Sequence, residues 1–175
     1  MKSARRQPPV IDIQLAIESD GWPAPALLEG FCRETIGAAA RYLAEQRNQP
    51  FPDQGCELSL LFADDAKVRV INRRWRGLDK ATNVLSFPTC PVMPGDMPGP
   101  LLGDVVFALE TVSQEAVSLD VPFDAHLTHL LVHGFLHLIG YDHLDDGDAR
   151  MMEGLETRIL ATLDLSDPYE NSDPI

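Results

Sequence analysis

The chain has 175 residues, of which 45% are hydrophobic and 23% charged, so it is long enough for one globular domain with one substantial core. Its formal net charge is −13, so the protein cannot attract phosphate groups through an overall positive charge. Binding to nucleic acid would require a local cluster of basic residues. No apolar run approaches a membrane span, and the three cysteines form no C-x-x-C pair, so we expect a cytoplasmic protein with reduced thiols and no membrane partner.

Hydrophobic periodicity and turn residues predict the elements in chain order. Strands are expected at residues 10–17, 56–62, 83–87 and 104–109, and helices at 26–46, 64–75, 110–117 and 122–139, with a last helix capped by Asp145 or Asp146. This order predicts an α+β fold, a small mixed β-sheet of about four strands packed with helices. We expect a single domain over residues 1–175, with loose tails at 1–9 and 165–175.

The segment 89–100 is rich in proline and glycine and cannot form a regular element. A surface loop is the preferred interpretation, and a flexible wall of a substrate groove is the alternative. The segment 67–80 holds six cations that form a candidate basic patch: Lys67, Arg69, Arg73, Arg74, Arg76 and Lys80.

The sequence HGFLHLIGYDH at residues 133–143 contains three histidines. His133 and His137 are four residues apart, which places both on one face of the helix at 122–139, near enough to share an ion. This helix carries so little polar surface that it should be the buried central helix. Gly140 can end it in a left-handed conformation and let the chain double back, bringing His143 to the same ion. Three imidazoles leave a fourth position for water, as in a catalytic zinc site.

Two alternatives remain open around this motif. His129 lies four residues before His133, so His129, His133 and His137 could be the ligands instead. We prefer His143, because three histidines along one straight helix converge less well on one ion than two histidines and a returning loop. The spacing H-x-x-x-H-x-x-G-x-x-H is also that of metzincin zinc proteases, but Gly134 stands where those enzymes have a glutamate base.

The motif at 133–143 resembles the signature of the YbeY family of bacterial metal-dependent endoribonucleases, and the likeness extends to residues 78–88 and 102–104. The family pattern Y-R-G-K-D reads Trp75-Arg76-Gly77-Leu78-Asp79 here. The resemblance implies that Arg76 faces the metal, where a permanent positive charge would stabilise the extra negative charge of phosphodiester cleavage. We therefore expect Arg76 to be catalytic, and Arg73 and Arg74 to be phosphate contacts or surface charges. No general base can be assigned.

The resemblance predicts a single-strand-specific endoribonuclease with one Zn²⁺ per chain, held by His133, His137 and His143. It further implies a role in maturation of the 3′ end of 16S rRNA and in ribosome quality control, with single-stranded RNA and the small ribosomal subunit as partners. The alternatives are a zinc metallopeptidase-like hydrolase and a ribosome-associated binding protein with a structural zinc. A structural site would have four protein ligands, and a catalytic site three.

Overall fold

The computed structural model describes residues 7–170, so residues 1–6 and 171–175 of the expected tails at 1–9 and 165–175 lie outside the described residues. The strands are β1 (Ile11–Ile17), β2 (Cys56–Ala63), β3 (Val84–Pro88) and β4 (Leu101–Ala108). The helices are α1 (Pro25–Gln46), α2 (Asp65–Arg76), α3 (Leu109–Ser118), α4 (Phe123–Leu138) and α5 (Asp146–Thr162). The predicted α+β class is confirmed.

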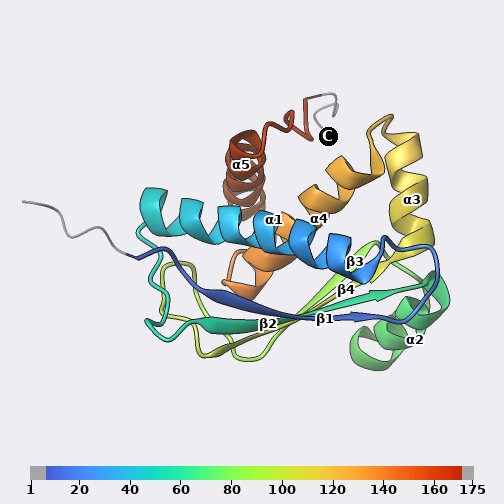
Figure 1. The fold of residues 1–175 in the computed structure, drawn as a ribbon, viewed down its shortest axis with the longest axis horizontal. Helices are drawn as coiled ribbons and strands as arrows, with labels where there is room; N and C mark the ends of the chain where they lie inside the picture. The colour runs from blue at the N-terminus through green and yellow to red at the C-terminus, as the bar shows by residue number, and fades with distance from the viewer. Residues whose placement is uncertain (1–6, 171–175) are drawn as a thin grey trace, which may run out of the picture.

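The four strands form one mixed sheet in the order β1-β2-β4-β3. β1, β2 and β4 run parallel, and β3 pairs antiparallel to β4 at the edge of the sheet. In Figure 1, α1, α3, α4 and α5 lie above the sheet, and α2 lies below it. The main core fills the space between the sheet and the upper helices, and a smaller cluster around Val68, Leu85 and Val106 lies between the sheet and α2. Edge strand β3 is thus placed beside α4.

Local capping fixes where the helices begin and end. Asp64 caps α2 by accepting a hydrogen bond from Lys67 N at 2.8 Å, and Gly77 ends it with a φ of 73°, as predicted. Asp145 caps α5 in the same way, accepting from Asp148 N. No helix between residues 7 and 170 is long and apolar enough to cross a bilayer.

Strand β4 begins at Leu101, three residues earlier than the sequence predicts. The prediction ended the loop at residue 100 and began the strand at residue 104, so it assigned residues 101–103 to neither. Glycine is uncommon inside strands, and Gly103 lies within β4. Gly103 has a φ of 141°, and a Cβ on it would collide with the backbone of Phe87 on β3. The glycine therefore permits a close approach of the two strands at a register shift in the sheet.

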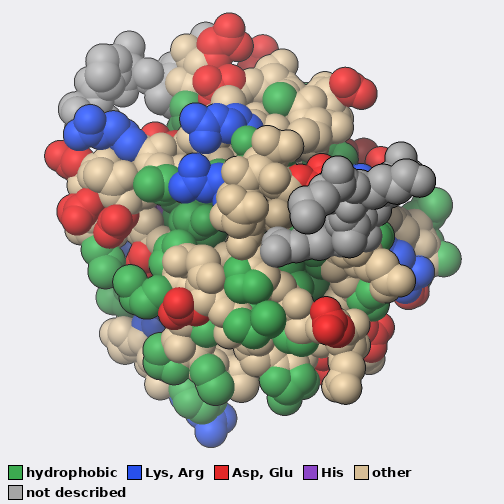
Figure 2. Space-filling view, turned by 90° about the vertical axis from the view of Figure 1, so that its left-hand side faces the viewer, with side chains coloured by type: hydrophobic (Ala, Val, Ile, Leu, Met, Phe, Trp, Pro, Cys, Tyr) green, Lys and Arg blue, Asp and Glu red, His purple; other side chains and the backbone are tan. Residues whose placement is uncertain are grey.

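The loop at 89–100 is held in place by the buried side chain of Gln49, which is 2% exposed. Its Nε2 donates to Asp96 O at 2.8 Å, and its Oε1 accepts from Gly95 N at 3.1 Å. Figure 2 shows the face of the molecule that includes the end of α1, with hydrophobic side chains mostly in its lower half and basic ones mostly at the upper left. The two hydrogen bonds from Gln49 hold the loop at 89–100 in place, so they do not support the alternative that this loop is a flexible wall of a substrate groove.

The prediction of a loose tail from residue 165 is wrong for residues 165–170. Leu165 packs against the main core, and the Tyr169 hydroxyl donates a hydrogen bond to the Glu156 carboxylate on α5. The prediction relied on the acidic composition of this segment and did not take into account the contacts of Leu165 and Tyr169.

Candidate metal centre

The last two turns of α4 carry His133 and His137 on one face. Their Nε2 atoms lie 3.1 Å apart, and their side chains are 23% and 20% exposed. α4 is otherwise almost entirely buried, so its position against the sheet and α5 is fixed by packing. The two imidazoles therefore have little freedom to move apart.

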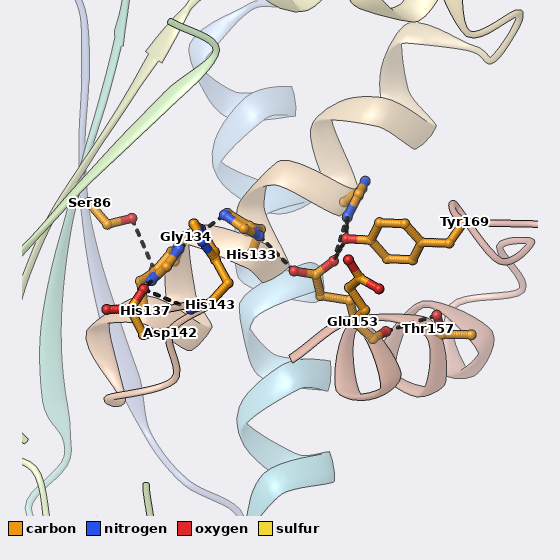
Figure 3. Close-up of polar contacts among 11 residues, drawn as sticks. Ser86, His133, Gly134, His137, Asp142, His143, Glu153, Thr157 and Tyr169 are labelled. Carbon is orange, nitrogen blue, oxygen red and sulfur yellow. Dashed lines mark hydrogen bonds and ion pairs between the residues drawn. The ribbon is translucent and has the colours of Figure 1, made fainter. Parts of the chain in front are cut away.

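Gly140 follows α4 with a φ of 104° and reverses the chain. A Cβ at this position would overlap the backbone of Val92 in the loop at 89–100, so only glycine fits. The reversal brings the His143 ring to 5.1 Å from the ring centroid of His137 and 5.8 Å from that of His133. Figure 3 shows the three rings side by side.

One nitrogen from each of these histidines lies within 4.8 Å of the other two, so the group could hold a metal ion. Two nitrogens bound to one tetrahedral Zn²⁺ at 2.0–2.1 Å are about 3.3 Å apart, close to the observed separation of the His133 and His137 Nε2 atoms. Burial and the neighbouring His133 lower the pKa of His137 to about 4, so its imidazole is neutral at neutral pH. Neutral imidazole is the form that binds metal. The geometry and the neutral His137 ring therefore fit a Zn²⁺ ion held by His133, His137 and His143.

Glu156 supports the site from α5. Its side chain is 1% exposed, and His133 Nδ1 lies 2.6 Å from its Oε1, which leaves His133 Nε2 free for the ion. Burial alone would raise the pKa of Glu156, but hydrogen bonds from His129 and His133 outweigh it and lower the pKa to about 2. Glu156 is therefore a buried carboxylate placed to fix the orientation of a candidate ligand, and a dashed line drawn from His133 in Figure 3 marks an interaction on this side of the ring.

The other two histidines of α4, His126 and His129, contact carboxylates outside the candidate metal centre. His126 is buried, and its Nε2 lies 2.7 Å from Glu115 Oε2. His129 Nε2 lies 2.7 Å from Glu156 Oε2 and 3.2 Å from the Tyr169 hydroxyl. The alternative set of His129, His133 and His137 is not brought together, because His129 Nε2 contacts Glu156 and His129 is not among the histidines whose nitrogens lie within 4.8 Å of one another.

Gly134 is buried where α4 crosses the sheet. A Cβ here would lie 2.7 Å from Val105 Cγ1 and 3.3 Å from Ser86 Oγ, and Gly134 O accepts a hydrogen bond from Ser86 Oγ at 3.3 Å. The absence of a glutamate thus has a steric reason, because this side of α4 packs against β3 and β4. A side chain at this position could not act as the base of a metzincin-like peptidase.

The three histidines open into a cleft of about 560 Å³ whose lining includes Arg76, Ser86 and Asp142. Arg76 lies at the end of α2, and its Nη2 donates to Ser86 O at 3.1 Å on edge strand β3. Its guanidinium also lies over the Phe87 ring, 5.6 Å from the ring centroid. The predicted cation and the predicted metal ligands therefore line one cleft.

Sequence reasoning missed Glu156 and Tyr169. Glu156 interrupts the apolar face of α5 between Leu155 and Ile159, and a charge on a buried helical face is a signal that could have found it. Tyr169 gave no such signal, because its segment has no hydrophobic periodicity.

Taken together, the fold and the site define an α+β protein in which three histidines that could hold a metal ion line an open cleft beside an edge strand. The profile of the endoribonuclease YbeY family matches residues 31–164. The chain is 61% identical over 164 residues to the endoribonuclease YbeY of Rhizobium meliloti, covering 94% of this chain and 98% of that protein. It is 56% identical over 165 residues to the protein of the same name from Agrobacterium fabrum, with the same coverage.

The solution structure of TM1509 from Thermotoga maritima shares the fold. Its TM-score is 0.50 at 22% identity, over 94% of this chain and 98% of that chain. The chain belongs to the YbeY family, as the profile and the identity to its relatives show.

Proposed function

We propose that the chain is a single-strand-specific, metal-dependent endoribonuclease that acts in maturation of the 3′ end of 16S rRNA and in ribosome quality control. The observation that carries the proposal is the shared cleft of the three histidines and Arg76 in a member of the YbeY family. Relatives that are 61% and 56% identical bear the name endoribonuclease. The partners would be single-stranded RNA and the small ribosomal subunit, so we also propose a cytoplasmic location.

In this proposal His133, His137 and His143 hold one Zn²⁺ per chain. When bound, the ion would supply Lewis acidity toward a phosphoryl oxygen and a water nucleophile at neutral pH. Glu156 holds His133 in the tautomer with a free Nε2. The site draws on residues from α2 to α5, which agrees with our proposal of one domain over the whole chain.

Arg76 would bind the non-bridging oxygens of the scissile phosphate. Its Nη2 is already held by Ser86 O, so the planar group is oriented before RNA arrives, and a preoriented cation loses little entropy on binding. A guanidinium stays charged at every relevant pH and can stabilise the additional negative charge of the transition state. No side chain is assigned as the base.

Two alternatives are less well supported. A peptidase would need a base at residue 134, where packing leaves no room. A structural zinc would need a fourth protein ligand, and among residues 7–170 the group that could hold a metal contains three histidines.

The test uses the purified full chain, its zinc content and its cleavage of RNA carrying the 3′ end of 16S rRNA, in single-stranded and duplex form. We expect about one equivalent of zinc and cleavage of the single strand alone, lost with a chelator and restored by zinc. Zinc binding without RNA cleavage would favour the structural role, and cleavage of peptides instead of RNA would favour the peptidase.

A further inference from the structure

The exposed side chain of Trp75 on α2 has no packing role that explains it. It is 65% exposed, whereas Trp22, the other tryptophan, is 8% exposed and hydrogen-bonded to Ala63 O. The Arg74 guanidinium lies over the Trp75 ring, 5.2 Å from its centroid. An exposed indole beside an arginine is the combination that binds single-stranded nucleic acid, in which bases stack on the aromatic ring and the cation contacts phosphate.

Trp75 lies at a second groove, the outer groove, on the face of the sheet that carries α2. The outer groove measures about 580 Å³, and its lining includes Gln14, Ser59, Ile71, Trp75, Phe87 and Asp104. Phe87 lies in this groove, and Arg76, whose guanidinium covers Phe87, lines the metal cleft. The metal cleft and the outer groove therefore meet at edge strand β3, with Arg76 at the boundary.

The charges near the outer groove are divided between its rim and its floor. Two cations of the basic patch are paired, Lys67 with Glu18 at 3.3 Å and Arg69 with Asp79 at 2.8 Å. Arg73 and Arg74 are exposed and make no ion pair within residues 7–170. These two cations are free to contact phosphate.

The floor of the groove has the opposite sign. Asp104 is exposed and pairs in register with Phe87 across β3 and β4. A phosphate would be repelled from this floor, but a base would not, because a carboxylate can accept hydrogen bonds from base amino groups. The arrangement suits a strand whose phosphates follow the arginines and whose bases turn toward the groove.

We propose that a nucleobase of single-stranded RNA stacks on Trp75 at the mouth of the outer groove, on the same strand that passes Arg76 in the metal cleft. This inference rests on the proposed function. Arg73 and Arg74 contact the backbone phosphates of that strand, and duplex RNA is excluded from the contact because its bases are already stacked and paired.

The test measures binding of a 2′-O-methyl RNA of roughly 10 nucleotides to the full, zinc-loaded chain. The methyl groups prevent attack by the RNA's own 2′-hydroxyl, and recovery of the intact oligonucleotide after the measurement shows that water has not cleaved it either. Trp75→Leu keeps an apolar side chain without a ring and should weaken single-strand binding about 5- to 100-fold, with the salt dependence unchanged. Trp75→Phe keeps a ring and should bind within about threefold of wild type. Duplex binding should be the same in all three proteins.

Fluorescence supplies a second measurement, because Trp22 is buried and Trp75 is not. Saturation with the single strand should quench wild-type emission, and the quenching should be lost in Trp75→Phe although binding persists. If Trp75→Leu binds as wild type and emission is unchanged, no base stacks on Trp75. Concentration-dependent dimerisation that Trp75→Leu abolishes would also overturn the inference, in favour of contact between two copies of the chain.

The experiments distinguish a failure of the stacking proposal from a failure of the endoribonuclease proposal. If the wild-type protein cleaves RNA but Trp75→Leu binds the single strand as wild type and emission does not change, the stacking is disproved and the endoribonuclease proposal stands. A wild-type protein that neither binds nor cleaves single-stranded RNA would disprove both.

Discussion

Three histidines with distinct surroundings form the candidate metal centre, so their substitution should separate ligands from bystanders. We expect His133→Ala, His137→Ala and His143→Ala each to lower bound zinc well below one equivalent, because two imidazoles hold the ion far less tightly than three. His126→Ala is the matched control on the same helix, since His126 pairs with Glu115. Metal analysis after dialysis would measure this, and full occupancy in His143→Ala would move the third ligand elsewhere.

Arg76 should act on the chemical step. Arg76→Ala should lower single-turnover cleavage at saturating RNA about 10²- to 10³-fold, by analogy with loss of one oxyanion-stabilising donor, and leave zinc content unchanged. Arg73→Ala and Arg74→Ala are the controls, because an outer phosphate contact affects binding and its salt dependence instead. A wild-type rate in Arg76→Ala with saturating RNA would make Arg76 a docking residue only.

Glu156 should affect the metal without touching it. Glu156→Gln keeps the shape but can no longer accept charge-assisted hydrogen bonds from both His129 and His133. Loss of such a partner behind a ligand typically weakens metal binding about 10- to 100-fold, and competition with a chromogenic chelator would measure the change. Glu153→Gln, an exposed change on the same helix, is the control. Equal zinc affinity in the two variants would show that His133 needs no carboxylate.

At the scale of elements, the crossing of α4 over the sheet depends on Gly134. Gly134→Ala should destabilise the protein by about 1–3 kcal/mol, because the new methyl group must displace Val105 in a packed interior. Gly30→Ala on α1 is the control, since a Cβ there meets nothing within 4 Å, and the change should be neutral or stabilise the helix by up to about 1 kcal/mol. Urea unfolding of both variants tests this, and equal stability of Gly134→Ala and wild type would contradict the packing argument.

The elements show which parts of the structure could be predicted from the sequence. Local signals were sufficient for α2, because its cap at Asp64 and its end at Gly77 are encoded within a few residues. The reversal that carries His143 was also local, through Gly140. Contacts between distant segments were not predictable: the carboxylate behind His133 comes from α5, and its Tyr169 partner comes from a segment without periodicity. Gly103 lies within β4 because the backbone of the neighbouring strand β3 leaves no room for a side chain there. The order of residues along the chain does not reveal this neighbour.

For the whole molecule, the partly buried His137 and the buried Glu156 should make the stability of the fold depend on pH. The pKa of His137 falls from 6.5 to about 4 in the folded chain, so the unfolded chain binds more protons between these values. Stability should therefore decrease as the pH falls from about 6.5 to about 4, by an amount of order 1–3 kcal/mol. The pKa of Glu156 falls from 4.5 to about 2, so its contribution is lost in turn as the pH falls through that lower window.

Urea unfolding of the chelator-treated protein across this pH range would measure the loss without interference from metal release. His137→Gln should flatten the curve between pH 6.5 and 4 and leave the lower window unchanged. A flat wild-type curve between those values would show that His137 titrates normally in the folded chain.

The Gln49 side chain has a consequence for the lifetime of a bound ion. It anchors the loop at 89–100, and the backbone of that loop lies against Gly140, which turns the chain toward His143. If His143 holds an ion, a backbone movement that carries it away would have to displace an anchored loop. This would raise the barrier to dissociation by that route without strengthening any bond to the ion. The residence time of the metal would then depend in part on a buried amide just beyond α1, far along the chain from every proposed ligand.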